Sequence, residues 1–145
     1  MGKKRIITKG EQAGEGEIVA SKETVVKSGR HVAVAIAHIR ATYNNTLILI
    51  TDERGNALAS ASAGGVGFSG TRKSTPYAAA RVAEIVADKA KRLGVADISV
   101  RVSGVGAGRD SAVRALANHG LNLLSIKDIT PIPHNGPRRA KVRRV

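Results

Sequence analysis

The sequence lacks cysteine and tryptophan, and its aromatic residues are limited to Tyr43, Phe68 and Tyr77. Without cysteine, the chain can form neither a disulfide framework nor a thiolate metal site. Three aromatic rings are too few to stack a run of unpaired bases, which argues against base recognition on an aromatic sheet surface. No apolar run reaches the roughly 18 residues of a transmembrane helix, and no apolar leader segment opens the chain. We therefore expect a soluble intracellular protein.

Positive charge dominates the composition. The 145 residues include 24 Lys and Arg against 11 Asp and Glu, which gives a net charge of +13 and an isoelectric point near 11.0. Residues 1–10 hold four bases and no acid, and residues 131–145 hold five bases and no acid. Such segments are typically disordered until they meet a polyanion. Because no basic segment also carries an apolar face, the pattern favours a nucleic acid as partner over a membrane surface. The bases of the C-terminal segment are Arg138, Arg139, Lys141, Arg143 and Arg144.

Composition divides the chain into three parts. Residues 1–30 form an N-terminal extension of mixed charge, residues 31–130 carry the apolar pattern of one α/β domain, and residues 131–145 are a basic C-terminal tail. The apolar residues of the middle part are almost all aliphatic, so the core must be built from Ala, Val, Ile and Leu.

Hydrophobic periodicity predicts the elements of the middle part. Its first half reads as three strands joined by polar turns, an antiparallel meander, and its second half alternates strands with helical patterns. A strand–helix–strand order implies right-handed crossovers between parallel strands. The fold class is therefore α/β, with a mixed five-stranded sheet, two helices and a topology like that of ribonuclease-H-type nucleases. The predicted strands cover residues 31–39, 46–51, 57–61, 95–102 and 121–129; the predicted helices cover residues 76–93 and a segment that Asp110 or Ser111 caps and that ends near Gly120.

A glycine-rich basic loop leads into the first predicted helix. Its glycines allow close turns and leave amide groups open, and two bases follow them. Thr75 is a good N-cap and Pro76 suits the first helical position, so the positive end of the helix dipole should lie beside the two bases. We interpret the loop as an anion site. Its residues are Gly65, Gly67, Gly70, Arg72 and Lys73.

A second glycine-rich basic loop lies at residues 103–109, where glycines and Arg109 precede the second predicted helix. Both loops follow strands, so both should lie at the carboxyl edge of the sheet, where α/β folds usually bind ligands. Arg109 is a phosphate contact in this interpretation, and pairing with Asp110 is the alternative.

Several sequence patterns could indicate an enzyme, but the residues around each of them do not fit. Gly65, Gly67 and Gly70 match the spacing of a dinucleotide-binding loop, but the strand before them belongs to a meander and no acid follows in the position that holds a ribose. A P-loop fails because Thr71 stands where that motif has lysine. The acids are not clustered as a two-metal nuclease requires, and the histidines lack metal-ligand spacing. We predict no enzyme and no cofactor; a nucleotide-binding or nuclease-like enzyme is the alternative class.

Four segments resemble one family, the bacterial form of small-subunit ribosomal protein eleven. They are Ala37-His-Ile-Arg-Ala-Thr-Tyr-Asn-Asn-Thr46, Thr51-Asp-Glu-Arg-Gly-Asn-Ala57, the stretch from Ala63 to Ala79 around the first glycine loop, and Thr130-Pro-Ile-Pro-His-Asn-Gly136. The resemblance extends over residues 31–145. It implies a cytoplasmic protein of the ribosome that binds ribosomal RNA of the small-subunit platform, touches neighbouring platform proteins and lies near the messenger RNA path at the exit site.

The resemblance also implies contact residues. It adds Asn44, Asn45, His134 and Asn135 to the basic candidates already named; the two asparagines can equally form a polar turn, and His134 can equally order the tail. Three departures from the family pattern stand out, and the first is that residues 1–30, with their mixed charge, do not align with it. Val105 and Ala107 replace prolines in the second glycine loop, which should be less rigid before binding. The tail reads Pro137-Arg-Arg-Ala-Lys141, with an extra base and a shifted proline.

Overall fold

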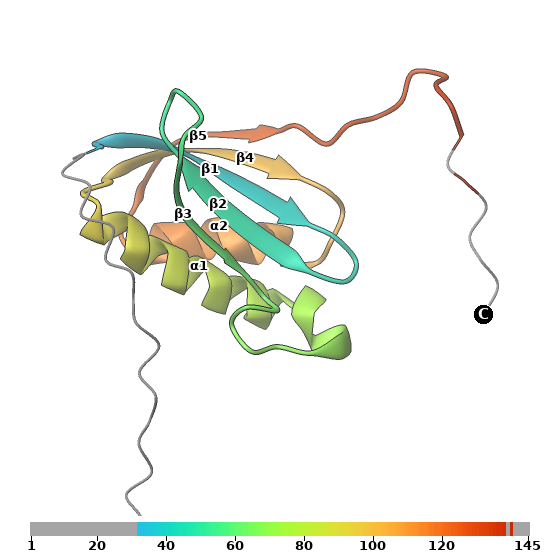
Figure 1. The fold of residues 1–145 in the computed structure, drawn as a ribbon, viewed down its shortest axis with the longest axis horizontal. Helices are drawn as coiled ribbons and strands as arrows, with labels where there is room; N and C mark the ends of the chain where they lie inside the picture. The colour runs from blue at the N-terminus through green and yellow to red at the C-terminus, as the bar shows by residue number, and fades with distance from the viewer. Residues whose placement is uncertain (1–31, 139, 141–145) are drawn as a thin grey trace, which may run out of the picture.

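Five strands form one mixed sheet in the order β3-β2-β1-β4-β5, and two helices lie on one side of it (Figure 1). The computed structural model describes residues 32–138 and residue 140. β1 is antiparallel to β2 and β2 to β3, whereas β1 and β4, and β4 and β5, are parallel. The strands are β1 (Val34–Ala41), β2 (Thr46–Thr51), β3 (Ala57–Ser62), β4 (Asp97–Ser103) and β5 (Asn122–Asp128); the helices are α1 (Pro76–Arg92) and α2 (Gly108–Asn118), with a 3-10 turn η1 (Gly70–Ser74) before α1.

The predicted meander and crossovers are thus confirmed, as is the α/β class with a five-stranded mixed sheet and two helices. The further likeness to ribonuclease-H-type folds stays a prediction. The extension predicted at residues 1–30 lies outside the described residues, as do residues 139 and 141–145 of the tail, and the predicted tail disorder stays a prediction.

Helix α1 has the signals at both ends that the sequence predicts. The hydroxyl of Thr75 accepts a hydrogen bond from the Ala78 amide at 3.2 Å, and Pro76 occupies the first helical position. At the other end, Gly94 has φ +82°, and the Val95 amide donates to the Ala90 carbonyl at 3.1 Å. This glycine-terminated C-cap explains why β4 begins at Asp97, two residues later than expected, because Val95 still belongs to the helix end.

Helix α2 begins earlier than predicted, and neither Asp110 nor Ser111 is its N-cap. Ala107 holds that position and supplies no capping side chain. The start is set by packing: a Cβ on Gly108 would lie 2.5 Å from Oγ1 of Thr46 and 2.8 Å from Cβ of Ala79. Only glycine allows this approach of α2 to the sheet and to α1. Asp110 lies in the first turn instead, where a carboxylate favours the positive end of the helix.

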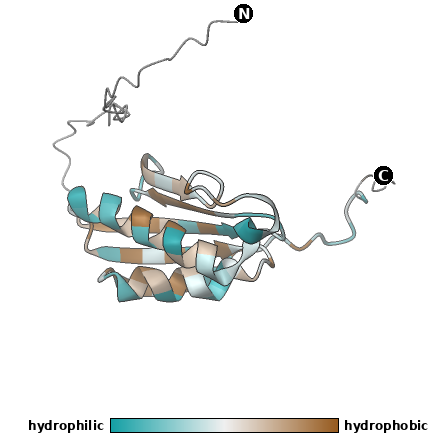
Figure 2. Ribbon diagram, turned by 90° about the horizontal axis from the view of Figure 1, so that it is seen from below, coloured by the Kyte–Doolittle hydropathy of each residue, from teal (hydrophilic) through white to brown (hydrophobic). Residues whose placement is uncertain are grey.

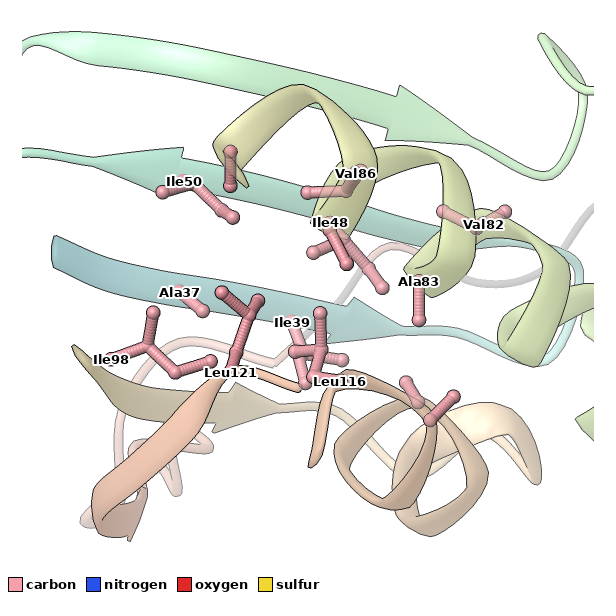
Figure 3. Packing of buried hydrophobic residues seen from close by; sticks show 14 of the residues in the cluster. Ala37, Ile39, Ile48, Ile50, Val82, Ala83, Val86, Ile98, Leu116 and Leu121 are labelled. Carbon is pink, nitrogen blue, oxygen red and sulfur yellow. The ribbon is translucent and has the colours of Figure 1, made fainter. Parts of the chain in front are cut away.

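The core lies between the helices and one face of the sheet (Figure 3). β1 contributes every second residue to it, Ala35, Ala37 and Ile39, and the alanines of α1 allow the helix to pack closely. Seen from the helix side, apolar and polar stretches alternate along both helices (Figure 2). The buried residues of α1, among them Val82 and Val86, belong to the core. Aliphatic residues therefore fill most of the interior, with Thr46 and Thr51 as its buried polar residues. The bulkiest fully buried side chains are Ile39, Ile48, Ile50, Ile98, Leu116, Val82, Val86, Val100 and Thr46.

Candidate nucleic-acid interface

Four segments leave the sheet at its carboxyl edge, which we define as residues 42–45, 63–75, 104–109 and 129–138. β1, β3, β4 and β5 run in the same direction, so the segments that follow them emerge together (Figure 1). Backbone bonds join neighbouring segments: the Ala63 amide donates to the Thr46 carbonyl at 3.0 Å, and the Gly106 amide to the Ala41 carbonyl at 3.0 Å. The two predicted glycine loops therefore share one edge.

The first glycine loop is folded on itself before it reaches α1. Gly67 and Gly70 have φ of +101° and +56°, a backbone conformation that a residue with Cβ rarely adopts. The ring of Phe68, half-buried, packs edge-on against Tyr77 with centroids 5.9 Å apart. The amide of Gly65 donates a hydrogen bond to Oγ of Ser62 at 3.3 Å, which ties the start of the loop to the strand before it.

Arg72 and Lys73 lie in the 3-10 turn beside the start of α1, as the sequence predicted. Arg72 is exposed and Lys73 half-buried, and neither forms an ion pair among the described residues. The helix start offers fewer free amides than expected. Pro76 has no N–H, and Thr75 accepts hydrogen bonds from the amides of Ala78 and Ala79. The Tyr77 amide is therefore the free donor of this turn among the described residues. An anion at this turn would therefore contact the two cations more than the helix amides.

The β1–β2 turn holds Asn44 and Asn45. The Thr42 hydroxyl donates to the Asn45 carbonyl and accepts from its amide, both at 3.0 Å, so backbone and Thr42 form the turn. Oδ1 of Asn45 is buried without a partner among the described residues, and Asn44 is exposed. Neither asparagine side chain is needed to close the turn, and that of Asn44 is exposed to a partner.

The second glycine loop packs against this turn. A Cβ on Gly104 would lie 2.1 Å from the Ala41 carbonyl oxygen, and one on Gly106 would lie 2.4 Å from that of Thr42. Gly104 and Gly106 therefore allow close contact between two backbone segments of the protein. By contrast, a Cβ on Gly67 or Gly70 would have no atom within 4 Å. The two loops are alike in sequence and different in their surroundings.

Arg109 is held by a ring of hydrogen bonds. Its guanidinium donates to the Gly104 carbonyl at 2.9 Å and to Oδ2 of Asp128 at 2.5 Å. The ring closes through Thr130, whose hydroxyl donates to Oδ1 of Asp128 and accepts from the Gly104 amide. Hydrogen bonds from Thr130 and then from Arg109 hold the pKa of Asp128 well below its usual range. The ionic partner of Arg109 is therefore Asp128 and not Asp110, and a phosphate role for it stays a prediction.

The C-terminal tail leaves the sheet after Thr130 (Figure 1). His134, Asn135 and Arg138 are exposed, and Asn135 has φ +55°, a turn conformation that asparagine tolerates. The structure does not bring these three residues together with the glycine loops. The remaining tail candidates Arg139, Lys141, Arg143 and Arg144 lie outside the described residues.

Two exposed side chains at this edge were not among the predicted site residues. Tyr43 in the β1–β2 turn is 77% exposed and Val105 in the second loop is 62% exposed. Both lie next to predicted polar or glycine positions. The sequence signal that could have identified them is a large apolar residue within a tight turn. With Arg40 and Thr130 they line a groove of about 420 Å³.

Residues 32–138 contain neither a candidate metal-ligand cluster nor a candidate membrane-spanning helix. His, Asp and Glu side chains of this part of the chain form no group of three that could hold a metal. The helices described are too short and too polar to cross a bilayer.

Comparison with known proteins identifies the family. The model of the family described as "Ribosomal protein S11" matches residues 35–144. The chain belongs to this family. The chain is also similar to "Small ribosomal subunit protein uS11" of Leptothrix cholodnii, with 48% identity over 126 residues, which cover 87% of this chain and 94% of the relative.

Membership of the family confirms the resemblance drawn from the four sequence segments. It makes the chain a structural protein of the small subunit of cytoplasmic ribosomes, a ribonucleoprotein component that works in translation beside ribosomal RNA and other ribosomal proteins. The family is non-enzymatic, in agreement with the prediction and against the nuclease alternative.

Proposed function

We propose that the carboxyl edge binds ribosomal RNA of the small-subunit platform through phosphate contacts. One observation carries this proposal: the four segments hold four bases and no acid, and two of these bases, Arg72 and Lys73, form no ion pair among the described residues. The other two are Arg109, which is paired with Asp128 just outside the segments, and Arg138, which lies in the tail. Phosphate oxygens are the main partners of Arg, Lys and open backbone amides in protein–nucleic acid complexes.

The β2–β3 turn at the opposite edge differs in charge from the carboxyl-edge loops. It holds Asp52, Glu53 and Arg54, a net charge of −1. Lys91 and Arg92 also lie at this edge, where they end α1 and offset the negative end of the helix dipole. The contrast between the acidic turn and the basic loops supports a polyanion at the carboxyl edge.

Within the edge, Arg72 and Lys73 are the principal contacts in this proposal. Both are without an acidic partner among the described residues, so a phosphate would not compete with an internal ion pair. Gly65, Gly67 and Gly70 keep the adjoining backbone narrow enough for close approach. Asn44 and Asn45 would donate side-chain hydrogen bonds from the neighbouring turn.

The tail would extend the same contact. Arg138 and the bases beyond it would bind phosphates at a distance from the domain, with His134 and Asn135 shaping or touching RNA at its start. As in the family that the chain resembles, we place the bound RNA near the messenger path at the exit site, with platform proteins as neighbours and messenger RNA as a further contact. The resemblance to the family supports this placement.

The salt dependence of RNA binding tests the proposal. The full chain is titrated with protein-free small-subunit ribosomal RNA over a series of KCl concentrations. Each phosphate contact contributes about 0.7 to 0.9 to the slope of log affinity against log salt. Replacing Arg72 and Lys73 by alanine should therefore lower the slope by about one each. An unchanged slope would show that these two side chains do not meet phosphate, and Arg54→Ala serves as the control.

A further inference from the structure

The sheet has a second face that neither helix covers. α1 packs on β2 and β3 and α2 packs on β1, all from the same side (Figure 1). The buried residues of β1 point to that side, so the residues between them face the other way: Val34, Ile36, His38 and Arg40. We call this second side the open face.

A row of bases crosses the open face. His38 on β1 is the register partner of Arg101 on β4, which is in turn the partner of Lys127 on β5. Arg40 follows two residues after His38 on the same face. Strands lie about 4.8 Å apart, so Arg101 and Lys127 are direct neighbours of like charge, an arrangement that destabilises a sheet.

No acid of the described residues balances this row. Their ion pairs join Arg81 to Glu84 and Arg109 to Asp128, both elsewhere. Asp97, the acid on the open face of β4, lies at the far end of the strand and accepts from Asn122 at 3.1 Å. Burial, and then the charge of Arg101, lower the pKa of His38, which therefore adds no positive charge at neutral pH. Arg40, Arg101 and Lys127 remain exposed and uncompensated.

The open face continues into the carboxyl edge. Arg40 and Ser103, the last residues of the face on β1 and β4, line the groove of about 420 Å³ together with Tyr43, Val105 and Thr130. Tyr43 offers an exposed aromatic ring at the mouth of this groove. Unpaired RNA bases stack on such rings, and their phosphates pair with nearby cations.

We propose that the open face is a second RNA surface, on which one strand pairs its phosphates with Arg40, Arg101 and Lys127 and inserts an unpaired base beside Tyr43. The inference rests on the proposed function, because it extends the RNA from the carboxyl edge over the sheet. Uncompensated cations, an exposed ring and continuity with the edge favour RNA over an acidic protein segment.

The test uses the full chain, protein-free small-subunit ribosomal RNA and the salt titration described above. Replacing Arg101 and Lys127 by glutamine should lower the slope by about two in total. The charge-retaining pair Arg101→Lys and Lys127→Arg should restore most of it. Tyr43→Ala should weaken binding about fivefold or more without changing the slope, because stacking involves no phosphate. Lys91→Gln with Arg92→Gln is the matched control, with the same loss of charge at the opposite edge.

The outcomes separate this inference from the proposed function. If Arg72 and Lys73 affect the slope and the Arg101 and Lys127 pair does not, the open face is not an RNA surface. If the glutamine pair leaves RNA binding unchanged yet weakens incorporation into small subunits, the face binds protein and the inference is overturned. If the unaltered chain fails to bind the RNA, both proposals fall. Circular dichroism and thermal unfolding of each variant confirm that it is folded, so a change in slope reports on contact.

Discussion

Arg109 at the start of α2 and Asp128 at the end of β5 are joined by an ion pair of 2.5 Å, which fastens the last strand and the tail to the second glycine loop. Because β5 is an edge strand and its helix-side residues are mostly exposed, this link is one of the few side-chain ties that hold it.

Asp128→Asn should make the protein less stable at neutral pH, and the difference should narrow in acid. The folded-state pKa of Asp128 is depressed, so its contribution is present above the ordinary carboxyl pKa and is lost as the pH falls through the folded value. Thermal unfolding of both proteins between pH 7 and pH 2 measures this. A gap in Tm that does not narrow below about pH 4 would contradict the role assigned to the carboxylate.

Gly104→Ala should destabilise the protein far more than Gly67→Ala. The two glycines have nearly equal φ, +98° and +101°, so the conformational strain of about 1 to 2 kcal/mol is shared. At Gly104 the new methyl would also overlap the Ala41 carbonyl, which lies 2.1 Å away, whereas no atom is within 4 Å at Gly67. Overpacking adds about 1 to 3 kcal/mol. Urea unfolding of both variants measures the difference, and equal losses would be inconsistent with the packed second loop.

Thr46→Val should stabilise the protein by about 1 kcal/mol. Thr46 is fully buried on β2, and its hydroxyl has no hydrogen-bond partner among the described residues. Thr51→Val is the matched control, because Thr51 is buried on the same strand but its hydroxyl contacts Nε2 of His38 at 3.4 Å. In urea unfolding, the free energy of unfolding should be higher for Thr46→Val than for the unaltered protein, and lower for Thr51→Val. The reverse order would rule out an unpaired hydroxyl at position 46.

Ala107→Pro should stabilise the protein by about 0.4 to 1 kcal/mol. Ala107 has φ −62°, the value that proline requires, its side chain is exposed, and its amide has no partner within the described residues. The substitution restores a proline that the family pattern has in this loop. A loss of stability in urea unfolding would mean that the loop before α2 cannot accept the ring.

Strong local signals made most of the fold predictable. Thr75 with Pro76, and Gly94 after the last basic turn, fixed the ends of α1 to within a residue, because caps depend on neighbours in the chain. The start of α2 was predicted wrongly, since it depends on Gly108 fitting against Thr46 and Ala79, which are distant in sequence. β1 also runs on to Ala41 because its neighbours Thr46 and Ser103 pair with its last residues, although Arg40 interrupts the apolar pattern.

The candidate site was predictable in part for the same reason. Arg72 and Lys73 were found because loop, cap and charge are adjacent in the sequence. The partnership of Arg109 with Asp128 and the row formed by His38, Arg101 and Lys127 arise only when β1, β4 and β5 pair. Strand register, and not local composition, decides those contacts.

Directed cleavage of RNA tests the carboxyl edge most directly. The chain has no cysteine, so a single introduced thiol can carry an iron chelate that cleaves RNA within its reach. Asn44→Cys places the probe in the exposed β1–β2 turn of the carboxyl edge, and Glu53→Cys places it in the exposed β2–β3 turn of the opposite edge. In reconstituted small subunits, strong cleavage of ribosomal RNA from position 44 and weak cleavage from position 53 is the predicted result. Strong cleavage from position 53 with none from position 44 would contradict the account.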